Sequence, residues 1–567
     1  MRSFSLSLLG SLSALSALSA CTPAAATPLS ATPAVAPTVS RPDGPPKGPD
    51  PFEASGPYRL EDLPEKEASF EAARSIYVRA RAREAELRKI IPGPSAACRR
   101  YARRTPIKPG EACPDRATSL SALSAAMLEN DPQQQDARLA GVEACGDLPV
   151  GFVRALRADL APPECADALV EAFLPLARGK EEAEPGGPVG HALVGLWLAG
   201  VLSRAVGPMP RMKRPFNRAT VLRYTGGPFK DWFVKQARAL DGLAVLASNL
   251  EGYGRAVAAV EAGLADMRFV DRVREVPIPD EWIEESEVRQ AYESQLDQAL
   301  EPRKLRGRDA ALVGLRELAL YGAVKDARVG RARALLSRLF GGARIDALDG
   351  LLLPEVQPAP PRSPEEILAS RLPTFYGGEL FPEPRADEAW VLTSTTQGLL
   401  PGVRQAFAKP DGASPPAFER YLRARVDLGR TFFRGADFDR VVQLAELAPE
   451  RFKTPESRFY LALSLALRKG PEGAFAMMKA PSPAALELRG TEALDALVSE
   501  AGPYAGQAAF AAAWLRQLSP PEEAGASWFL DVTARFRKAE SLLTASDDKA
   551  KARERGQVAY ETARVSK

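Results

Sequence analysis

Residues 188–203 read PVGHALVGLWLAGVLS and carry no formal charge. The stretch is shorter than the about 20 apolar residues that a transmembrane helix needs. A helix that is hydrophobic on all sides is typical of the buried centre of a protein. We therefore expect residues 188–203 to form a central helix, and we expect His191, the single histidine of the chain, to be a buried core residue.

The segments on both sides of this stretch carry the spacing of apolar residues that is typical of amphipathic helices. Thr118, and Asp131 followed by Pro132, are signals for helix starts. Residues 269–278 are a candidate extended segment, but no series of alternating strands accompanies them. The chain is therefore predicted to be all-α, with helices over 65–91, 117–129, 132–145, 149–160, 163–178, 229–249, 253–267, 286–301, 307–322 and 326–340.

The composition of the 567 residues is that of a folded protein, with 45% hydrophobic and 26% charged residues. The formal net charge of +3 gives no reason to expect a nucleic-acid partner. A single histidine excludes a two-histidine zinc site and a paired-histidine relay. The phosphate-binding motif G-x-x-x-x-G-K-S/T and the nucleophile motif G-x-S-x-G do not occur in the sequence. We therefore expect neither a metal nor a small-molecule cofactor.

The N-terminus has the pattern of an export signal. Residues 1–20 place Arg2 before an uncharged run of Leu, Ser and Ala, which is typical of a secretory signal peptide. The run ends in Leu18-Ser19-Ala20-Cys21, which resembles the lipobox of bacterial lipoproteins. The resemblance implies that Cys21 is lipidated and becomes the first residue after cleavage, and Thr22 after it implies sorting to the outer membrane, facing the periplasm or the cell surface.

Residues 22–60 contain ten prolines among Ala, Thr, Ser and Gly. Such a composition cannot bury a core, so the segment is predicted to be a disordered, extended tether. At about 3.1 Å per residue it would reach on the order of 100 Å from the membrane.

Four cysteines lie beyond Cys21, and an even number in an exported chain favours disulfides over free thiols. Three connectivities are possible. We expect the sequential one, because it closes short loops between neighbouring helices, and it pairs Cys98 with Cys113 and Cys145 with Cys165. A metal site is disfavoured because no C-x-x-C pair and no nearby histidine accompany these cysteines.

Two clusters of basic residues are candidate binding patches for anionic headgroups, lipopolysaccharide or an acidic partner. The other interpretation is plain solvated surface, which most charge clusters are. The first cluster contains Arg99, Arg100, Arg103 and Arg104, and the second contains Arg211, Lys213 and Arg214.

The clearest internal boundary is residues 354–384, which carry eight prolines. Within it, Ser363-Pro364-Glu365-Glu366 is a helix-start signal of the capping-box type. The expected organisation is therefore a signal peptide at 1–20, a lipidated cysteine and tether at 21–60, a disulfide-containing helical domain at 61–206, a middle helical domain at 207–353, a connector at 354–387 and a repeat region at 388–567.

The repeat region is predicted from two similar units. Ser414 begins a helix with Leu428, Gly429 and Phe432, and the next unit begins at Thr454-Pro455. Gly429 and Ser464 occupy matching places 35 residues apart, so the segment resembles a pair of tetratricopeptide repeats, whose period is about 34. The resemblance implies an α-solenoid that helices at 485–500, 505–517 and 525–545 would extend and the last twenty residues would cap.

One string has an enzyme-like pattern. Glu456-Ser457-Arg458-Phe459, with Gly473-Ala474 and Met477-Met478 after it, resembles a run of the lytic transglycosylases. The resemblance implies that Glu456 is a general acid for glycan cleavage, but the later Ala-Tyr-Asn signature of that family is missing. The other interpretation places Glu456 in the first turn of a repeat helix, where a negative charge suits the helix dipole.

The sequence therefore predicts an interaction protein rather than an enzyme. It would be a lipid-anchored, all-α scaffold of the cell envelope that binds an envelope protein through a groove between stacked helices. The alternatives are an enzyme that acts on peptidoglycan and a lipoprotein regulator of cell-wall synthesis.

Overall fold

The computed structural model describes residues 69–87, 90–102, 113–174, 184–320, 327–339, 347–354, 363–381, 415–432, 435–467, 491–518, 520–521 and 523–566. Every regular element in these ranges is helical, which confirms the all-α prediction. The predicted signal peptide, Cys21 and the tether lie outside the described residues. Within the described part of the chain, no helix combines the length and the apolar character that a membrane span requires.

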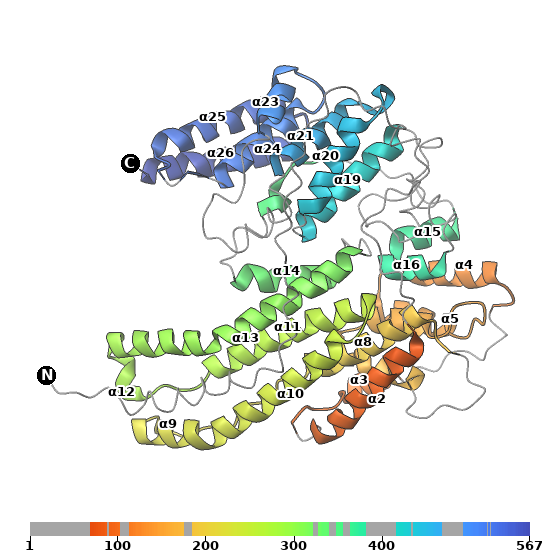
Figure 1. Cartoon of the computed structure of the whole chain (residues 1–567), viewed down its shortest axis with the longest axis vertical. Coiled ribbons are helices and arrows are strands. Elements are labelled where there is room, and N and C mark those ends of the chain that lie inside the picture. Colours follow the sequence, from red (N-terminus) through yellow and green to blue (C-terminus); the bar gives the residue numbers. More distant parts are fainter. Residues whose placement is uncertain are drawn as a thin grey trace, which may run out of the picture.

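The N-terminal lobe is built around α8 (Gly187–Ser203). Each residue from Val189 to Leu202 is buried, as expected for a helix with no charged side. Helices α2 (Phe70–Leu87), α7 (Ala166–Val170) and α11 (Gly252–Arg274) pack on it, and Figure 1 shows α8 within the lower lobe. The expected boundary at residues 206 and 207 falls in the loop after α8, and helices from both sides of this loop share one core.

Glycines let the central helices approach closely. A Cβ atom on Gly254 of α11 would lie 1.9 Å from the carbonyl oxygen of His191 in α8, and one on Gly195 would lie 2.3 Å from the carbonyl oxygen of Gly254. A Cβ on Gly263 would lie 2.7 Å from the carbonyl oxygen of Gly307, where α11 packs on α13 (Ser286–Leu320). These positions have no room for a larger residue, because the neighbouring atoms are backbone.

Two expectations for this part of the chain are wrong. Residues 286–301 and 307–322 are not separate helices, since α13 continues through Pro302. An interior proline costs about 3 kcal/mol, and the long packing of α13 along α11 offsets that cost. Residues 269–278 are not an extended segment, because α11 continues to Arg274 and buries Phe269, Val270 and Val273.

The disulfide-containing part of the lobe consists of short helices. Asp131 caps α5 as expected, and its carboxylate accepts hydrogen bonds from the backbone of Gln133 and Gln134. Thr118 is not the cap of α4, because Asp115 takes that place and accepts the Thr118 N–H. The expected helix at 163–178 is a continuous run of 3₁₀ and α turns from Pro163 to Phe173, and residues 175–178 lie outside the described residues. The elements are α3 (Ala96–Ala102), α4 (Arg116–Met127), α5 (Pro132–Val142), α6 (Phe152–Leu160), η2 (Pro163–Cys165) and η3 (Glu171–Phe173).

The remaining helices of the lobe line its lower edge and its upper side in Figure 1. A π-helical turn joins α9 to α10 at the lower edge, so the two run on as one bent rod. The elements are α9 (Arg218–Tyr224), η4 (Thr225–Phe229), α10 (Lys230–Ser248), α12 (Asp280–Ile283), α14 (Ala327–Leu339) and η5 (Ala347–Gly350).

The proline-rich segment expected as a connector contributes to the core of this lobe. Ser363 caps α15 (Pro364–Arg371) as expected, with its hydroxyl 3.2 Å from the Glu366 nitrogen. In α16 (Thr374–Leu380), Phe375 stacks on Tyr253 of α11 with ring centroids 4.5 Å apart. The part of the connector that the structure describes is therefore docked on the N-terminal lobe.

The C-terminal lobe is a series of helices in which each one packs on the next in sequence. Gly429 of α19 lies against Phe438 of α20, and a Cβ on it would be 2.7 Å from the ring. Ser464 of α21, at the matching place in the second unit, is fully buried. The elements are α19 (Pro415–Phe432), α20 (Gly435–Leu447), η7 (Glu450–Phe452), α21 (Pro455–Leu467), α23 (Thr491–Ser499), α24 (Ala505–Leu518), α25 (Ala526–Leu542) and α26 (Ser546–Val565).

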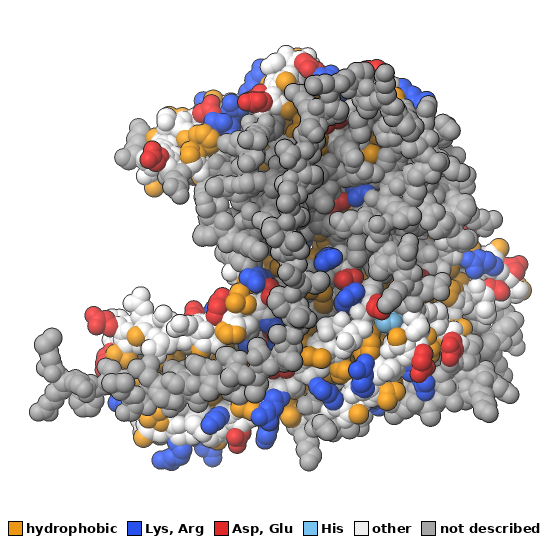
Figure 2. Space-filling view, in the orientation of Figure 1, with side chains coloured by type: hydrophobic (Ala, Val, Ile, Leu, Met, Phe, Trp, Pro, Cys, Tyr) orange, Lys and Arg blue, Asp and Glu red, His pale blue; other side chains and the backbone are white. Residues whose placement is uncertain are grey.

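The two lobes meet at α19, which contacts α13 and η5. Arg423 of α19 donates a hydrogen bond to the carbonyl oxygen of Pro354, and Gly350 of η5 lies against the ring of Trp514. Figure 2 shows the molecule hollowed between the lobes on the side where α12 and the C-terminus lie. The lobes are therefore joined along one side and separate along the other.

Candidate functional site

The four cysteines of the N-terminal lobe form two disulfides, as expected, but the expected connectivity is wrong. Cys98 pairs with Cys165, and Cys113 pairs with Cys145, at Cα–Cα distances of 4.9 and 5.2 Å. The sequential pairing fails because α3 packs on η2 and α7, which brings Cys98 beside Cys165 rather than beside its neighbour in sequence. The Cys113–Cys145 bridge therefore lies within the loop that the Cys98–Cys165 bridge closes.

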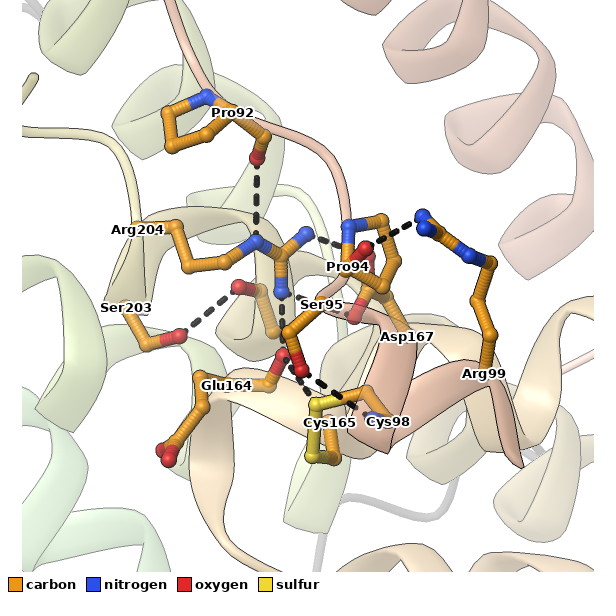
Figure 3. Close-up of a disulfide and its surroundings, with 11 residues drawn as sticks. Pro92, Pro94, Ser95, Cys98, Arg99, Glu164, Cys165, Asp167, Ser203 and Arg204 are labelled. Carbon is orange, nitrogen blue, oxygen red and sulfur yellow. Dashed lines mark hydrogen bonds and ion pairs between the residues drawn. A yellow bond between two sulfur atoms is a disulfide. The ribbon is translucent and has the colours of Figure 1, made fainter. Parts of the chain in front are cut away.

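Arg204 makes several hydrogen bonds beside the Cys98–Cys165 bridge, which we call the outer disulfide (Figure 3). Its guanidinium bonds both carboxylate oxygens of Asp167, and its Nε donates to the carbonyl oxygen of Pro92 at 3.0 Å. It also bonds the carbonyl oxygen of Glu164, next to Cys165. One arginine thus ties the end of α8 to α7 and to the loop before α3. The arrangement around this disulfide is structural.

A buried charge network fastens α5 to α6. Arg157 of α6 is 1% exposed and bonds Asp136 at 2.7 Å and Glu143 at 2.7 Å. Arg154 bonds Glu143 from the next turn at 2.6 Å. Every charged group in this network has an opposite partner, which is the condition under which buried charges are tolerated. The network has no charge left over for a ligand.

His191 is a buried core residue, as expected. Its side chain is in α8, and its Nδ1 accepts the backbone N–H of Glu251 at 3.0 Å. Burial lowers the pKa of His191, which favours the neutral imidazole that this hydrogen bond requires. The geometry assigns His191 to the junction of α8 and α11.

Glu456 lies in the first turn of α21. Its two carboxylate oxygens accept hydrogen bonds from the phenols of Tyr460 and Tyr504, at 2.8 and 3.0 Å. A general acid must be protonated and donate to the leaving oxygen, whereas here both oxygens act as acceptors. Glu419 lies near enough to Glu456 for the charge on Glu456 to contribute to raising the pKa of Glu419, after burial as the main cause. The later parts of the enzyme-like string, at 473–478, lie outside the described residues.

The two expected basic clusters lie on different faces. Arg99 and Arg100 are exposed on α3, and the rest of that cluster, Arg103 and Arg104, lies outside the described residues. Arg211, Lys213 and Arg214 are exposed in the segment before α9. The structure therefore brings the second cluster next to the helices α9 and α10, which carry further Lys and Arg side chains.

An open groove of about 730 Å³ lies beside this second cluster, at the end of the N-terminal lobe. Its walls come from the end of α11 and the segment after it, from α12, from the first turns of α13 and from the loop before α9. The backbone N–H of Asp280 donates to the carbonyl oxygen of Phe216 at 2.8 Å, which joins the loop to α12. We call this site the α12 groove, and its lining residues are Arg214, Phe216, Arg274, Val276, Pro277, Ile278, Asp280, Ile283, Tyr292, Glu293, Leu296 and Asp297.

The α12 groove has an apolar floor and a mixed rim. Val276 and Leu296 are 7% and 9% exposed, while Ile283 at the edge is 50% exposed. On one side of the rim, Arg274 is paired with Asp297. On the other side, Arg214 stacks over the ring of Phe216 at 5.2 Å and has no carboxylate partner among the described residues.

Sequence reasoning did not identify the α12 groove. Part of its lining comes from residues 276–283, where Val276, Ile278 and Ile283 stand among two prolines just after a long helix. That pattern indicates an irregular apolar segment, and it was the signal in the sequence that could have pointed to the groove. The opposite wall comes from α13, and only the packing of α13 along α11 brings it to this place.

The described part of the chain contains no group of three or more His, Cys, Asp or Glu side chains that could hold a metal ion. The comparisons with known proteins found no matching family model, no similar curated protein and no similar solved structure.

Proposed function

We propose that the protein is a lipid-anchored scaffold of the cell envelope that works by binding another envelope protein. The lipobox-like Leu18-Ser19-Ala20-Cys21 and the proline-rich 22–60 support the anchor and the tether. Such a tether would place a helical body within reach of periplasmic or surface partners. The outer membrane is the proposed location, because Thr22 follows the cysteine.

The α12 groove is the observation that carries the binding function. A volume of about 730 Å³ with an apolar floor lies within the range of ligand-binding clefts, about 300–1,000 Å³. Arg214 at its rim has no acidic partner among the described residues, so a ligand carboxylate would gain a charge-assisted bond there. The proposed occupant is a segment of an envelope protein with aliphatic side chains for the floor and one Asp or Glu for Arg214.

The C-terminal lobe supports the scaffold role in a second way. Its helices pack in sequence order, and Gly429 of the first unit lies at a tight contact, as the tetratricopeptide resemblance implies for that place. We propose that these helices form a degenerate tetratricopeptide-like array that presents a further surface to partners.

The alternative of a peptidoglycan-acting enzyme rests on Glu456. Two phenol donors on its carboxylate favour an anchoring role in which Glu456 fixes Tyr504 against α21. If the enzyme proposal holds, wild-type protein releases muropeptides from purified sacculi and Glu456→Gln abolishes the release. Absence of release from wild type would leave binding, including the regulation of cell-wall synthesis, as the function.

A photo-crosslinking experiment tests the groove. A benzophenone amino acid replaces Ile283, which is 50% exposed at the groove edge, or Leu530, which is 46% exposed on α25, as the matched control. We expect one reproducible envelope-protein adduct from position 283 that is reduced by Arg214→Glu and absent from position 530. The proposal fails if both positions give the same adducts, or if Arg214→Glu leaves the adduct at position 283 unchanged.

Labelling with palmitate tests the anchor separately. We expect label on the wild-type chain and none on Cys21→Ser. A chain that remains unlabelled, with an intact leader, would contradict the proposed location.

A further inference from the structure

The helices at the lower edge of the N-terminal lobe carry an unbalanced positive charge. Residues 211–240 contain eight Lys and Arg residues and a single acidic residue, Asp231. This one stretch therefore exceeds the net charge of +3 that the whole chain carries, and the rest of the chain is net negative. We call the eight cations the basic face, and all of them are exposed: Arg211, Lys213, Arg214, Arg218, Arg223, Lys230, Lys235 and Arg238.

The cations of the basic face have no carboxylate partners within ion-pair distance among the described residues. Elsewhere in the same lobe, surface arginines are commonly paired. Arg272 of α11, for example, is paired with Glu275 at 2.8 Å, and Arg338 of α14 is paired with Asp271. The basic face thus lacks side-chain ion pairs among the described residues, and the carboxylate that lies beside it, that of Glu281, bonds the Arg218 backbone nitrogen at 3.4 Å.

The other side of the same helices is firmly fixed in the core. Phe229 stacks on Trp232, and Trp232 stacks on Phe269 of α11, with ring centroids 5.8 and 5.6 Å apart. The Tyr224 hydroxyl donates to the carbonyl oxygen of Pro210 at 2.7 Å, which holds the loop against α9. Because the apolar side faces the core, the cations are held on the outer side, and Figure 2 shows Lys and Arg side chains along this lower edge.

We propose that the basic face docks on an anionic phospholipid surface. From Arg218 to Arg238 the rod extends on the order of 30 Å at about 1.5 Å per residue, so the charges are spread along a line instead of converging on one point. Cations that are spread in this way can each contact a different headgroup of a lipid surface. A site for a single acidic group would instead have several donors that point to one place. The choice of a lipid surface rests on the predicted anchor at Cys21, which would keep the body close to a membrane.

Vesicle flotation tests the basic face. The exported chain carries Cys21→Ser, so that acyl chains do not contribute, and it is mixed with vesicles of phosphatidylcholine alone or with added phosphatidylglycerol. The test variant is Lys235→Gln with Arg238→Gln, neither of which lines the α12 groove. The matched control is Arg537→Gln with Lys538→Gln, two exposed cations of α25.

We expect binding that requires phosphatidylglycerol and weakens with added salt. The test variant should bind about thirtyfold more weakly, since its two lost basic residues each contribute about 1 kcal/mol near such a surface, and the control should bind like the parent. The inference is overturned if the parent protein binds both kinds of vesicle equally or binds no vesicles. It is also overturned if the test variant and the control variant lose binding to the same extent. Capture of an acidic protein by the basic face without vesicle binding would also overturn it. Each of these failures leaves the crosslink at position 283 as a separate test of the groove.

Discussion

In the N-terminal lobe, the central helix α8 is covered by helices that lie far from it in sequence, such as α2 and α11. In the C-terminal lobe, each helix from α19 to α26 packs mainly on its neighbours in sequence. The N-terminal lobe also contains both disulfides and the buried Arg157 network. The comparison indicates that the first lobe depends on extensive packing between helices far apart in sequence, whereas the second distributes its stability over contacts between neighbours in sequence.

The largest effect is expected at the crossing of α8 and α11. Gly254→Leu would place side-chain atoms where the His191 carbonyl oxygen lies, and that backbone cannot move without separating the two helices. We expect loss of more than about 5 kcal/mol, which is the whole stability of many domains. Hydrogen exchange followed by mass spectrometry should show lost protection throughout the N-terminal lobe and retained protection in α24–α26.

Two glycines serve as comparisons for that result. Gly429→Ala in the C-terminal lobe meets the ring of Phe438, which can shift, so its cost should be about 1–3 kcal/mol. Gly330→Ala on α14 has open space around it and should stabilise by about 0.5–1 kcal/mol. Equal effects from Gly254→Leu and Gly429→Ala would contradict the proposed difference between the lobes.

The buried network should give the next largest effect. Arg157→Ala removes the buried cation that bonds the carboxylates of both Asp136 and Glu143, and we expect a loss of about 3–5 kcal/mol in the free energy of unfolding. The control is Arg458→Ala, which breaks a pair with Glu500 whose side chains are 46% and 49% exposed. Denaturant titration should give less than about 1 kcal/mol for that control.

Removal of the outer disulfide sharpens the comparison further. Cys98→Ser with Cys165→Ser opens a link between residues 67 apart in sequence, and we expect a loss of about 2–4 kcal/mol confined to the N-terminal lobe. Cys113→Ser with Cys145→Ser opens a link of 32 residues and should cost somewhat less. Peptide mapping of the unreduced protein checks the connectivity, and a Cys98–Cys113 peptide would refute the nested pairing.

The smallest effect is a dependence of stability on pH. Burial raises the pKa of Glu379 in α16 to about 7, above its usual value of 4.5. The folded state therefore keeps a proton that the unfolded state releases, and the free energy of unfolding should fall as the pH rises from about 4.5 to 7. Glu379→Gln should flatten this slope, so that the difference in the free energy of unfolding between pH 5 and pH 7 shrinks by about 1–2 kcal/mol in urea titrations. An unchanged slope would show that Glu379 is not its source.

The sequence was informative about features that depend only on the residues of one helix. The uncharged run at 188–203 predicted a buried helix, and Asp131 and Ser363 marked their helix starts correctly. The sequence was misleading about features that depend on packing against another segment of the chain. Two helices were expected at 286–301 and 307–322 where the packing of α13 on α11 carries one helix through Pro302, and four cysteines did not reveal their partners.

The candidate sites divide in the same way. The basic face could be recognised in part, because charge is a property of the residues themselves and Arg211, Lys213 and Arg214 are close in sequence. The α12 groove could not be recognised, because its lining comes from four stretches of the chain that only the tertiary structure brings together, at 214–216, 274–278, 280–283 and 292–297.

By itself the sequence determined the helical class, the burial of α8, the need to pair the cysteines and the surplus of cations at 211–240, since composition and periodicity are local properties. Only the tertiary structure decided which cysteines pair, which helices run unbroken, that the proline-rich segment docks through Phe375, and where a groove opens. The reason is physical. Those outcomes depend on which distant surfaces bury each other, and the free energy of that burial belongs to pairs of segments and not to either segment alone.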